Sequence, residues 1–422
     1  MNRKFSLFIF ILAFIFQTSN GQGIGIGEWR EHLPYKQTRS ITSGGNIIYC
    51  ATPYSLMYYN LDDYTLKRLS RVEGLNDMGI SRIGFNEDEN TLVIAYENTN
   101  IDIVKDNVII NMADIYNSTA ITPEEKSIYN LMFIDRFAYL LCGFGIVVID
   151  LDKVEVLDTW YIGPDGSHLK VFGLTCDDTF FYAATEEGIY YAERNDPNLA
   201  YFGAWSKDFS LPSPNAVYNH IAYNNGVLFA NKYSPEWSND SIFLRKDNQW
   251  LYDSELFINN DVYSLKVLDN QLYVVQVYSV RVVDANLNLA NVIWTYYDAD
   301  CNPRDVTLLK NSLWIADDKT GMVNQEGYQK YRPYYPNGPL NADVFDMSVE
   351  DENLWIAPGG RNLSWGNVWK RASTSYFVEN EWGSISASSP GAEGLDTLRD
   401  ILCIAVNPYF STQVFAGSWA ES

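Results

Sequence analysis

The sequence predicts an all-β protein: a β-propeller of four-stranded blades, about seven in a first ring, followed by the start of a second propeller. Two observations carry this prediction. One is a repeat of about 45 residues, and the other is the alternation of apolar and polar residues within each copy, between Asp/Asn/Gly turns. A helical repeat would need apolar residues three and four positions apart, and the copies lack that spacing.

The clearest copy runs from Val262 to Val274, as an alternating strand, a polar turn at Asp269–Asn270 and a second strand rich in aromatic residues. It overlays without a gap on the copy that begins at Val344. The copies begin at residues 38, 80, 128, 171, 217, 262, 303, 344 and 401. Two further β-rich runs follow in most copies, so one copy corresponds to one blade. We expect the first strand of each blade to line the channel.

The number of copies sets the predicted domain division, because one ring seldom closes with more than eight blades. Residues 22–343 are predicted to form the first propeller, and residues 344–422 the truncated beginning of a second one. The segment Trp29–Tyr35 is a candidate for the last strand of the closing blade. Trp355, in the second strand of its copy, is expected in the core, where truncation to Ala costs about 3–5 kcal/mol.

Residues 1–21 are predicted to be a secretory signal peptide. Arg3 and Lys4 supply its positive start, Phe5–Phe16 form its apolar run, and Gly21 is a small residue before a cleavage site ahead of Gln22. A helix over that run rises only about 18 Å, too short for a bilayer core of about 30 Å. The protein is therefore expected to be exported, with the periplasm as its transit compartment.

Composition excludes several classes of protein. The formal charge of −23 argues against nucleic-acid binding, which needs clustered cations, and an aromatic content of 15% excludes a disordered chain. Three His and five Cys leave little material for a metal site or a disulfide scaffold. Cys50 and Cys142 occupy a position that holds Ala in other copies, so we expect buried free thiols there.

No motif for catalysis is found, so no catalytic residue, metal ligand or cofactor is predicted, and no motif identifies ligand-binding residues. The three imidazoles lack nucleophile or metal-ligand spacing and are interpreted as surface or capping residues: His32, His168 and His220. Gly23-x-Gly25-x-Gly27 lacks the flanking strand and helix of a phosphate loop. Asp298-x-Asp300-x-Asn302 lacks the Gly and distal Glu of a calcium loop and is interpreted as a turn.

Four segments near the start of the chain resemble the PorZ family, cell-surface components of the type IX secretion system of Bacteroidetes. They are Glu28–Tyr35 (the specific part, with Trp-Arg-Glu-His-Leu-Pro-Tyr), Ile47–Thr52, Gly74–Ile83 and Leu92–Asp102. The resemblance implies two seven-bladed propellers and a C-terminal β-sandwich, of which this chain contains the N-terminal portion. It also implies a location at the outer membrane surface.

The same resemblance implies a non-catalytic docking function. The implied partners are the sortase PorU, PorV and PorQ, and the implied ligand is anionic lipopolysaccharide, which is presented to the sortase. An acidic protein needs a local basic patch to bind such a glycan, and we place that patch near Arg68 and Arg71. Asp240-Ser241-Ile242 and Asp396-Thr397-Leu398 resemble O-glycosylation sites of exported Bacteroidetes proteins, which makes Ser241 and Thr397 candidate acceptors.

Two other interpretations stay open from the sequence. The Gly74–Ile83 pattern also fits a glycan-sensing propeller ectodomain of a hybrid two-component regulator, in which a transmembrane helix and a kinase would follow. A propeller lyase or glycosidase would need a His/Tyr/Arg or carboxylate cluster on one face, and the scarcity of His disfavours it.

Overall fold

The computed structural model describes residues 29–236, 239–296 and 299–421. The chain divides into a unit of residues 1–32 and a unit of residues 33–422, and the described part of the first unit, Trp29 to His32, forms no helix or strand. The predicted signal peptide and the Gly23–Gly27 run lie outside the described residues. In the part of the chain that is described, no helix is long and apolar enough to cross a bilayer.

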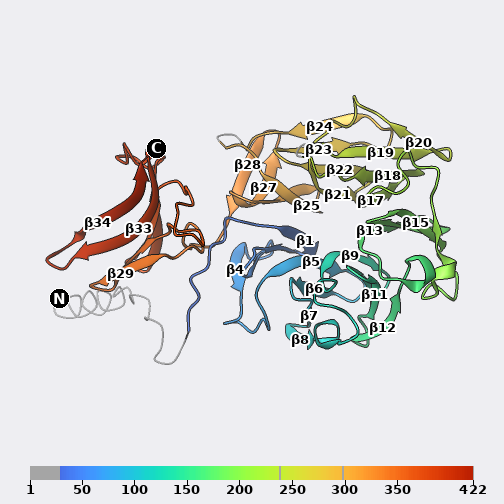
Figure 1. The fold of residues 1–422 in the computed structure, drawn as a ribbon, viewed down its shortest axis with the longest axis horizontal. Coiled ribbons are helices and arrows are strands. Elements are labelled where there is room, and N and C mark those ends of the chain that lie inside the picture. Colours follow the sequence, from blue (N-terminus) through green and yellow to red (C-terminus); the bar gives the residue numbers. More distant parts are fainter. Residues whose placement is uncertain (1–28, 237–238, 297–298, 422) are drawn as a thin grey trace, which may run out of the picture. The chain divides into compact units, whose positions relative to one another are not determined.

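Residues 40–334 form seven consecutive four-stranded antiparallel sheets, each made of four strands that follow one another in sequence. Figure 1 shows the first strands of these sheets facing a common centre. These innermost strands are β1 (Ser40–Gly44), β5 (Ile80–Asn86), β9 (Ile128–Ile134), β13 (Val171–Cys176), β17 (Tyr218–Asn224), β21 (Val262–Leu268) and β25 (Pro303–Leu309). The predicted fold class, a β-propeller of four-stranded blades, is confirmed.

The other strands follow outward in the same order in every blade. The second strands are β2 (Ile47–Ala51), β6 (Thr91–Tyr96), β10 (Phe137–Cys142), β14 (Phe180–Thr185), β18 (Val227–Lys232), β22 (Gln271–Gln276) and β26 (Ser312–Asp317). The third strands are β3 (Leu56–Asn60), β7 (Ile101–Lys105), β11 (Gly145–Asp150), β15 (Gly188–Glu193), β19 (Ser241–Lys246), β23 (Ser279–Val283) and β27 (Gly321–Gly327). The outer strands are β4 (Thr65–Leu69), β8 (Val108–Met112), β12 (Glu155–Trp160), β16 (Ser206–Lys207), β20 (Gln249–Tyr252), β24 (Leu289–Ile293) and β28 (Lys330–Tyr334). Helical turns occur at α2 (Asp114–Asn117), Pro164–Gly166 and Phe202–Ala204.

The turns and the core follow from the repeat. Asp269 and Asn270 both have positive φ, 48° and 56°, as a two-residue hairpin turn requires, and Asp and Asn tolerate that conformation better than most residues. The second strands are buried along most of their length, because each sheet packs between two neighbours. Cys50 and Cys142 are free and fully buried as predicted, and burial raises the pKa of both thiols.

Blade packing closes the ring between β25 and β1, without an extra strand. No strand lies between residues 29 and 39, so the expected strand from Trp29–Tyr35 is absent. Instead Tyr35 is buried with Trp314 and Ile41, and the Thr38 hydroxyl donates to the Asp317 carbonyl at 2.8 Å. Closure by side-chain packing leaves each blade with four strands from one continuous segment.

Residues 346–421 repeat the blade pattern in a second region. β29 (Asp346–Glu350), β30 (Asn353–Ala357), β31 (Ser373–Val378) and β32 (Glu381–Ser386) form a four-stranded sheet, and β33 (Leu398–Asn407) pairs with β34 (Phe410–Glu421). The Ile404 amide donates to Asp346 at 3.0 Å, as the Ile41 amide does to Asp305 at 3.1 Å in the ring. Trp355 is half-buried, so the predicted loss of unfolding free energy on its truncation to Ala, which assumed a fully buried side chain, is too large. The domain division at residue 343 stays a prediction.

Candidate functional site

The repeat places equivalent side chains around the entrance of the channel. In six of the seven innermost strands the pairing register slips after the first residue, which leaves the second residue as a β-bulge. The bulged residues, with Arg39 as their counterpart before β1, are Arg39, Ser81, Tyr129, Phe172, Asn219, Tyr263 and Arg304. The next position inward holds Ser40, Arg82, Asn130, Gly173, His220, Ser264 and Asp305.

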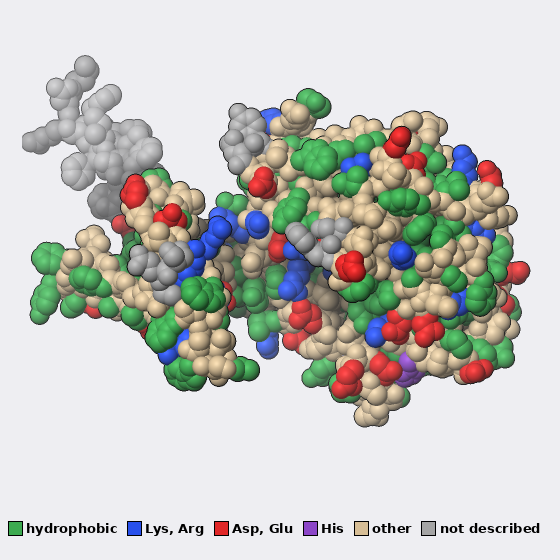
Figure 2. Space-filling view, turned by 45° about the horizontal axis from the view of Figure 1, so that its top comes forward, with side chains coloured by type: hydrophobic (Ala, Val, Ile, Leu, Met, Phe, Trp, Pro, Cys, Tyr) green, Lys and Arg blue, Asp and Glu red, His purple; other side chains and the backbone are tan. Residues whose placement is uncertain are grey.

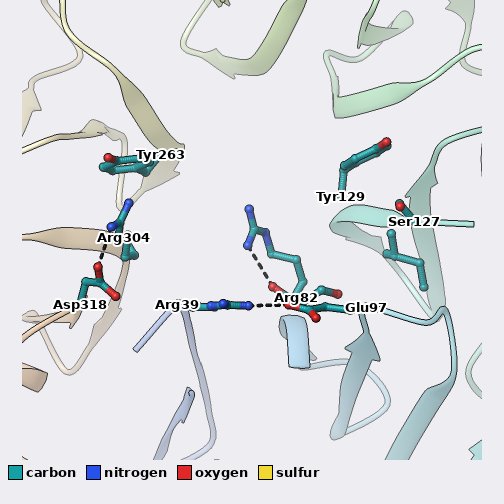
Figure 3. Close-up of a pocket in the computed structure, with 10 residues that line it drawn as sticks. Arg39, Arg82, Glu97, Ser127, Tyr129, Tyr263, Arg304 and Asp318 are labelled. Carbon is teal, nitrogen blue, oxygen red and sulfur yellow. Dashed lines mark hydrogen bonds and ion pairs between the residues drawn. The ribbon is translucent and has the colours of Figure 1, made fainter. Parts of the chain in front are cut away.

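Two hollows that share Arg39, Arg82 and Arg304 in their linings occupy this entrance. The outer one is an open cavity of about 610 Å³ that is lined by Arg39, Arg82 and Arg304, and a smaller one of about 190 Å³ lies along the innermost strands and includes Lys266. Figure 3 shows the Arg82 guanidinium projecting into the opening between Tyr263 and Tyr129. The described residues that line the two hollows include four cations and three carboxylates. The lining is therefore slightly positive, although the net charge of the protein is −23.

Asp305 is the acidic residue at the centre of this channel, and its carboxylate is fully used. The donors come from two other blades, so Asp305 on β25 is a clasp that joins its own blade to those of β1 and β21. They are Ile41 N at 3.1 Å, Ser40 Oγ at 3.4 Å, Ser264 Oγ at 2.9 Å and Lys266 Nζ at 2.7 Å. A carboxylate with this many donors fixes the strands around it.

Two of the three arginines at the entrance are paired with carboxylates. Arg39 Nη1 lies 2.6 Å from Glu97, and Arg304 Nη2 lies 2.6 Å from Asp318. The Arg304 guanidinium also stacks over the Tyr263 ring at 4.1 Å, and its pKa is raised by Asp318 against the opposing effect of burial. Both pairs are partly exposed, so they fix geometry more than they add stability.

Arg82 differs from these two residues. Its Nη1 donates to the backbone carbonyl of Ser81 at 2.9 Å, and no carboxylate among the described residues lies within ion-pair distance of it. Burial lowers the pKa of Arg82, Asp305 opposes that effect, and nearby Arg39 adds to it. Because a guanidinium remains charged in proteins, the channel entrance carries one uncompensated positive charge.

His220 lies on β17 in the channel, which corrects its interpretation as a surface or capping residue. Burial and the charge of Arg82 lower its pKa to about 4, so the ring is neutral at pH 7, with Nε2 at 3.1 Å from the Val262 carbonyl. The blade containing His220 begins at residue 218, one position later than its predicted start, and this turns His220 inward. His168 is partly exposed and lies 2.8 Å from Glu125, whereas His32 is exposed.

The remaining predicted positions do not join this site. Arg68 lies on β4 with its guanidinium 6.0 Å from the Tyr35 ring, and Arg71 is exposed in the turn that follows. Ser241 begins β19 and Thr397 precedes β33, both partly exposed, and their glycosylation stays a prediction. Asp298 lies outside the described residues, and no group of three potential metal ligands is found among those that are described. Figure 2 shows acidic and basic side chains interspersed over the visible face.

Sequence reasoning missed the arginine cluster because its members come from three separate copies of the repeat. The signal was nevertheless present: the second and third positions of each copy face the channel, and those positions hold Arg39, Arg82 and Arg304. Comparing copies column by column would have placed them together once ring closure was assumed.

A known family of propeller domains matches part of this chain. Residues 48–206 match a family model described as the N-terminal β-propeller domain of PorZ, with the secretion system abbreviated TSS9. The fold and the match together show that these residues are similar to the propeller domain of a type IX secretion system protein. The match confirms the resemblance to the PorZ family that the sequence predicts.

A solved structure extends the likeness of the fold. PorZ from Porphyromonas gingivalis, described as an essential bacterial surface component of the type-IX secretion system, matches with a TM-score of 0.77 and 19% identity, over 93% of this chain and 51% of that chain. The present chain thus spans about half the length of that protein. BamB from Moraxella catarrhalis has a TM-score of 0.47 and 11% identity over 69% of this chain and 84% of that one, too low to carry an argument. No curated protein matches.

Proposed function

We propose that this protein is an exported cell-surface component of the type IX secretion system that acts by docking, without catalysis. The match of residues 48–206 to the PorZ propeller domain carries the proposal. A rigid ring with loops on two faces suits the recognition of large partners. The proposed ligand is anionic lipopolysaccharide, which the protein would present to the sortase PorU together with PorV and PorQ.

The channel entrance supports the binding of an anionic ligand. Its excess positive charge is local, and a local field of this kind can attract an anion to an otherwise acidic protein. The supporting feature is thus Arg82 and its neighbours, on the innermost strands, in place of the Arg68–Arg71 patch that the sequence favours.

Binding measurements test this function. The purified 422-residue chain is passed over immobilised anionic lipopolysaccharide, and separately over the sortase complex, at several ionic strengths. We expect saturable binding to both, with the lipopolysaccharide contact weakening as the Debye length falls from about 10 Å at 0.1 M salt to about 3 Å at 1 M. Absence of binding to both at every ionic strength would contradict the proposal. Selective binding of neutral oligosaccharides would favour a sensor ectodomain.

A further inference from the structure

Arg82 is placed as a ligand-binding group would be. The three other cations of the entrance and channel each have a carboxylate: Arg39 has Glu97, Arg304 has Asp318 and Lys266 has Asp305. Arg82 has one backbone carbonyl. A guanidinium has five N–H donors in a planar fork, so most of its donor capacity faces the cavity. Keeping a partly desolvated charge without a counter-ion is costly.

A structural explanation for Arg82 is weak. It does not fasten neighbouring blades, because its hydrogen bond goes to Ser81, the adjacent residue on its own strand. Asp305, the nearest candidate for a counter-ion in the channel, already accepts from Lys266 and from several neighbouring donors. Asp305 therefore holds the neighbouring blades together, and Arg82 faces the open cavity.

The walls of the cavity indicate the size and kind of the ligand. Tyr129 and Tyr263 stand on opposite sides of the Arg82 guanidinium (Figure 3). The Tyr129 ring is held by Phe172 at a centroid distance of 4.8 Å, and the Tyr263 ring is held by Arg304 at 4.1 Å. Two fixed aromatic rings on either side of a cation, around a space of about 610 Å³, suit a ring-sized group that can pack against an aromatic face and that carries a negative charge.

We propose that the channel entrance binds an oxyanion carried on a sugar ring, with Arg82 donating to the oxyanion and Tyr129 and Tyr263 flanking the sugar. This deepens the proposed function by giving it a site, and it rests on that function for the natural source of the ligand. The shared chemistry is two oxygen acceptors on one atom, which a guanidinium fork contacts in a bidentate manner. A uronic acid carboxylate and a sugar phosphate both provide it.

Calorimetric titration of the 422-residue chain tests the site directly. The probes are glucuronate, glucose 6-phosphate and neutral glucose. We expect both anions to bind at least about tenfold more tightly than glucose, and the tighter of the two identifies the carboxylate or the phosphate as the preferred group. Arg82→Gln should weaken anion binding at least about tenfold, and Arg82→Lys should weaken it less, because the charge is kept and the fork is lost.

Arg71→Gln is the matched control, since it removes the same charge from an exposed turn outside the channel and should leave binding unchanged. The proposal is overturned if wild-type protein binds neither anion better than glucose, or if Arg82→Gln and Arg82→Lys, folded by circular dichroism, bind like wild type. An equal loss in Arg71→Gln overturns it as well.

Failure of the site and failure of the function are distinguishable. If wild-type protein binds lipopolysaccharide while no variant at Arg82 affects the sugar anions, the docking function stands and the site is wrong. If the sugar anions bind at Arg82 while lipopolysaccharide and the sortase complex do not bind, the site stands and the proposed function is wrong.

Discussion

The same four residues, Leu-Trp-Ile-Ala, occur in two blades and meet different environments. In β26 all four, Leu313 to Ala316, are buried, and Trp314 is only 2% exposed. In β30 the corresponding Leu354 and Trp355 are half-buried. The sheet of β26 packs between two neighbouring sheets of the ring, whereas that of β30 has the β33–β34 hairpin as its packing partner among the described residues. Burial in a propeller is therefore set by the neighbouring blades, with local sequence unchanged.

The tryptophan pair gives the largest expected difference between the two regions. Trp314→Ala should lower the free energy of unfolding by about 3–5 kcal/mol, because it empties a site packed against Tyr59 and Tyr334. Trp355→Ala should cost about 1–2 kcal/mol, since its side chain keeps contact with water and with Tyr376. Hydrogen exchange read peptide by peptide assigns each loss to its own region. Equal losses of unfolding free energy in the two variants would contradict the conclusion that neighbouring blades set the burial of each tryptophan.

The two clasp aspartates come next. Asp305→Ala should cost about 3 kcal/mol, because it leaves Lys266 without its carboxylate and the Ile41 amide without its acceptor. Asp346→Ala should cost about 1 kcal/mol, because the corresponding contact there is the Ile404 amide. Urea unfolding of each variant measures both values, and Asp305→Asn is the control that retains the shape. A larger loss at Asp346 would contradict the assignment of the clasp.

The repeat explains how much could be predicted from sequence. Blade type and the pairing of first with second strands follow from alternation and turn residues such as Asp269 and Asn270, which are local signals. The channel site depends on two things that are not local. The register of β17, which begins one residue later than predicted, places His220 in the channel, and ring closure brings Arg304 beside Arg39. The half-burial of Trp355 was missed for the same reason, since its neighbours lie in another blade.

Acid should weaken the ring through His220 and should leave residues 344–421 without this effect, because they contain no His. The pKa of His220 falls from 6.5 to about 4 on folding, with Arg82 and Asp305 as the charged groups around it. Between those values the unfolded chain binds a proton that the folded ring does not, so stability is lost as the pH falls from about 6.5 to 4. The loss attributed to His220 is about 2 kcal/mol after allowance for partial exposure.

Comparison of wild type with His220→Gln isolates this effect, because carboxylates contribute to both curves alike. The difference in unfolding free energy between the two proteins should change over that pH interval and be constant above pH 7. A difference that is independent of pH would show that folding does not change the pKa of His220.

The smallest expected effect lies at Met347, the counterpart of Val306. Val306 is 0% exposed in β25, and Val306→Ala should cost about 2 kcal/mol because a packed methyl pair is lost. Met347 is 57% exposed in β29, so Met347→Ala should change the unfolding free energy by less than about 0.5 kcal/mol. Thermal unfolding of the two variants, each against wild type, gives the contrast. A cost at Met347 equal to that at Val306 would mean that another surface covers β29 in solution. Both innermost strands would then be buried, and the two regions would differ only in the surface that buries them.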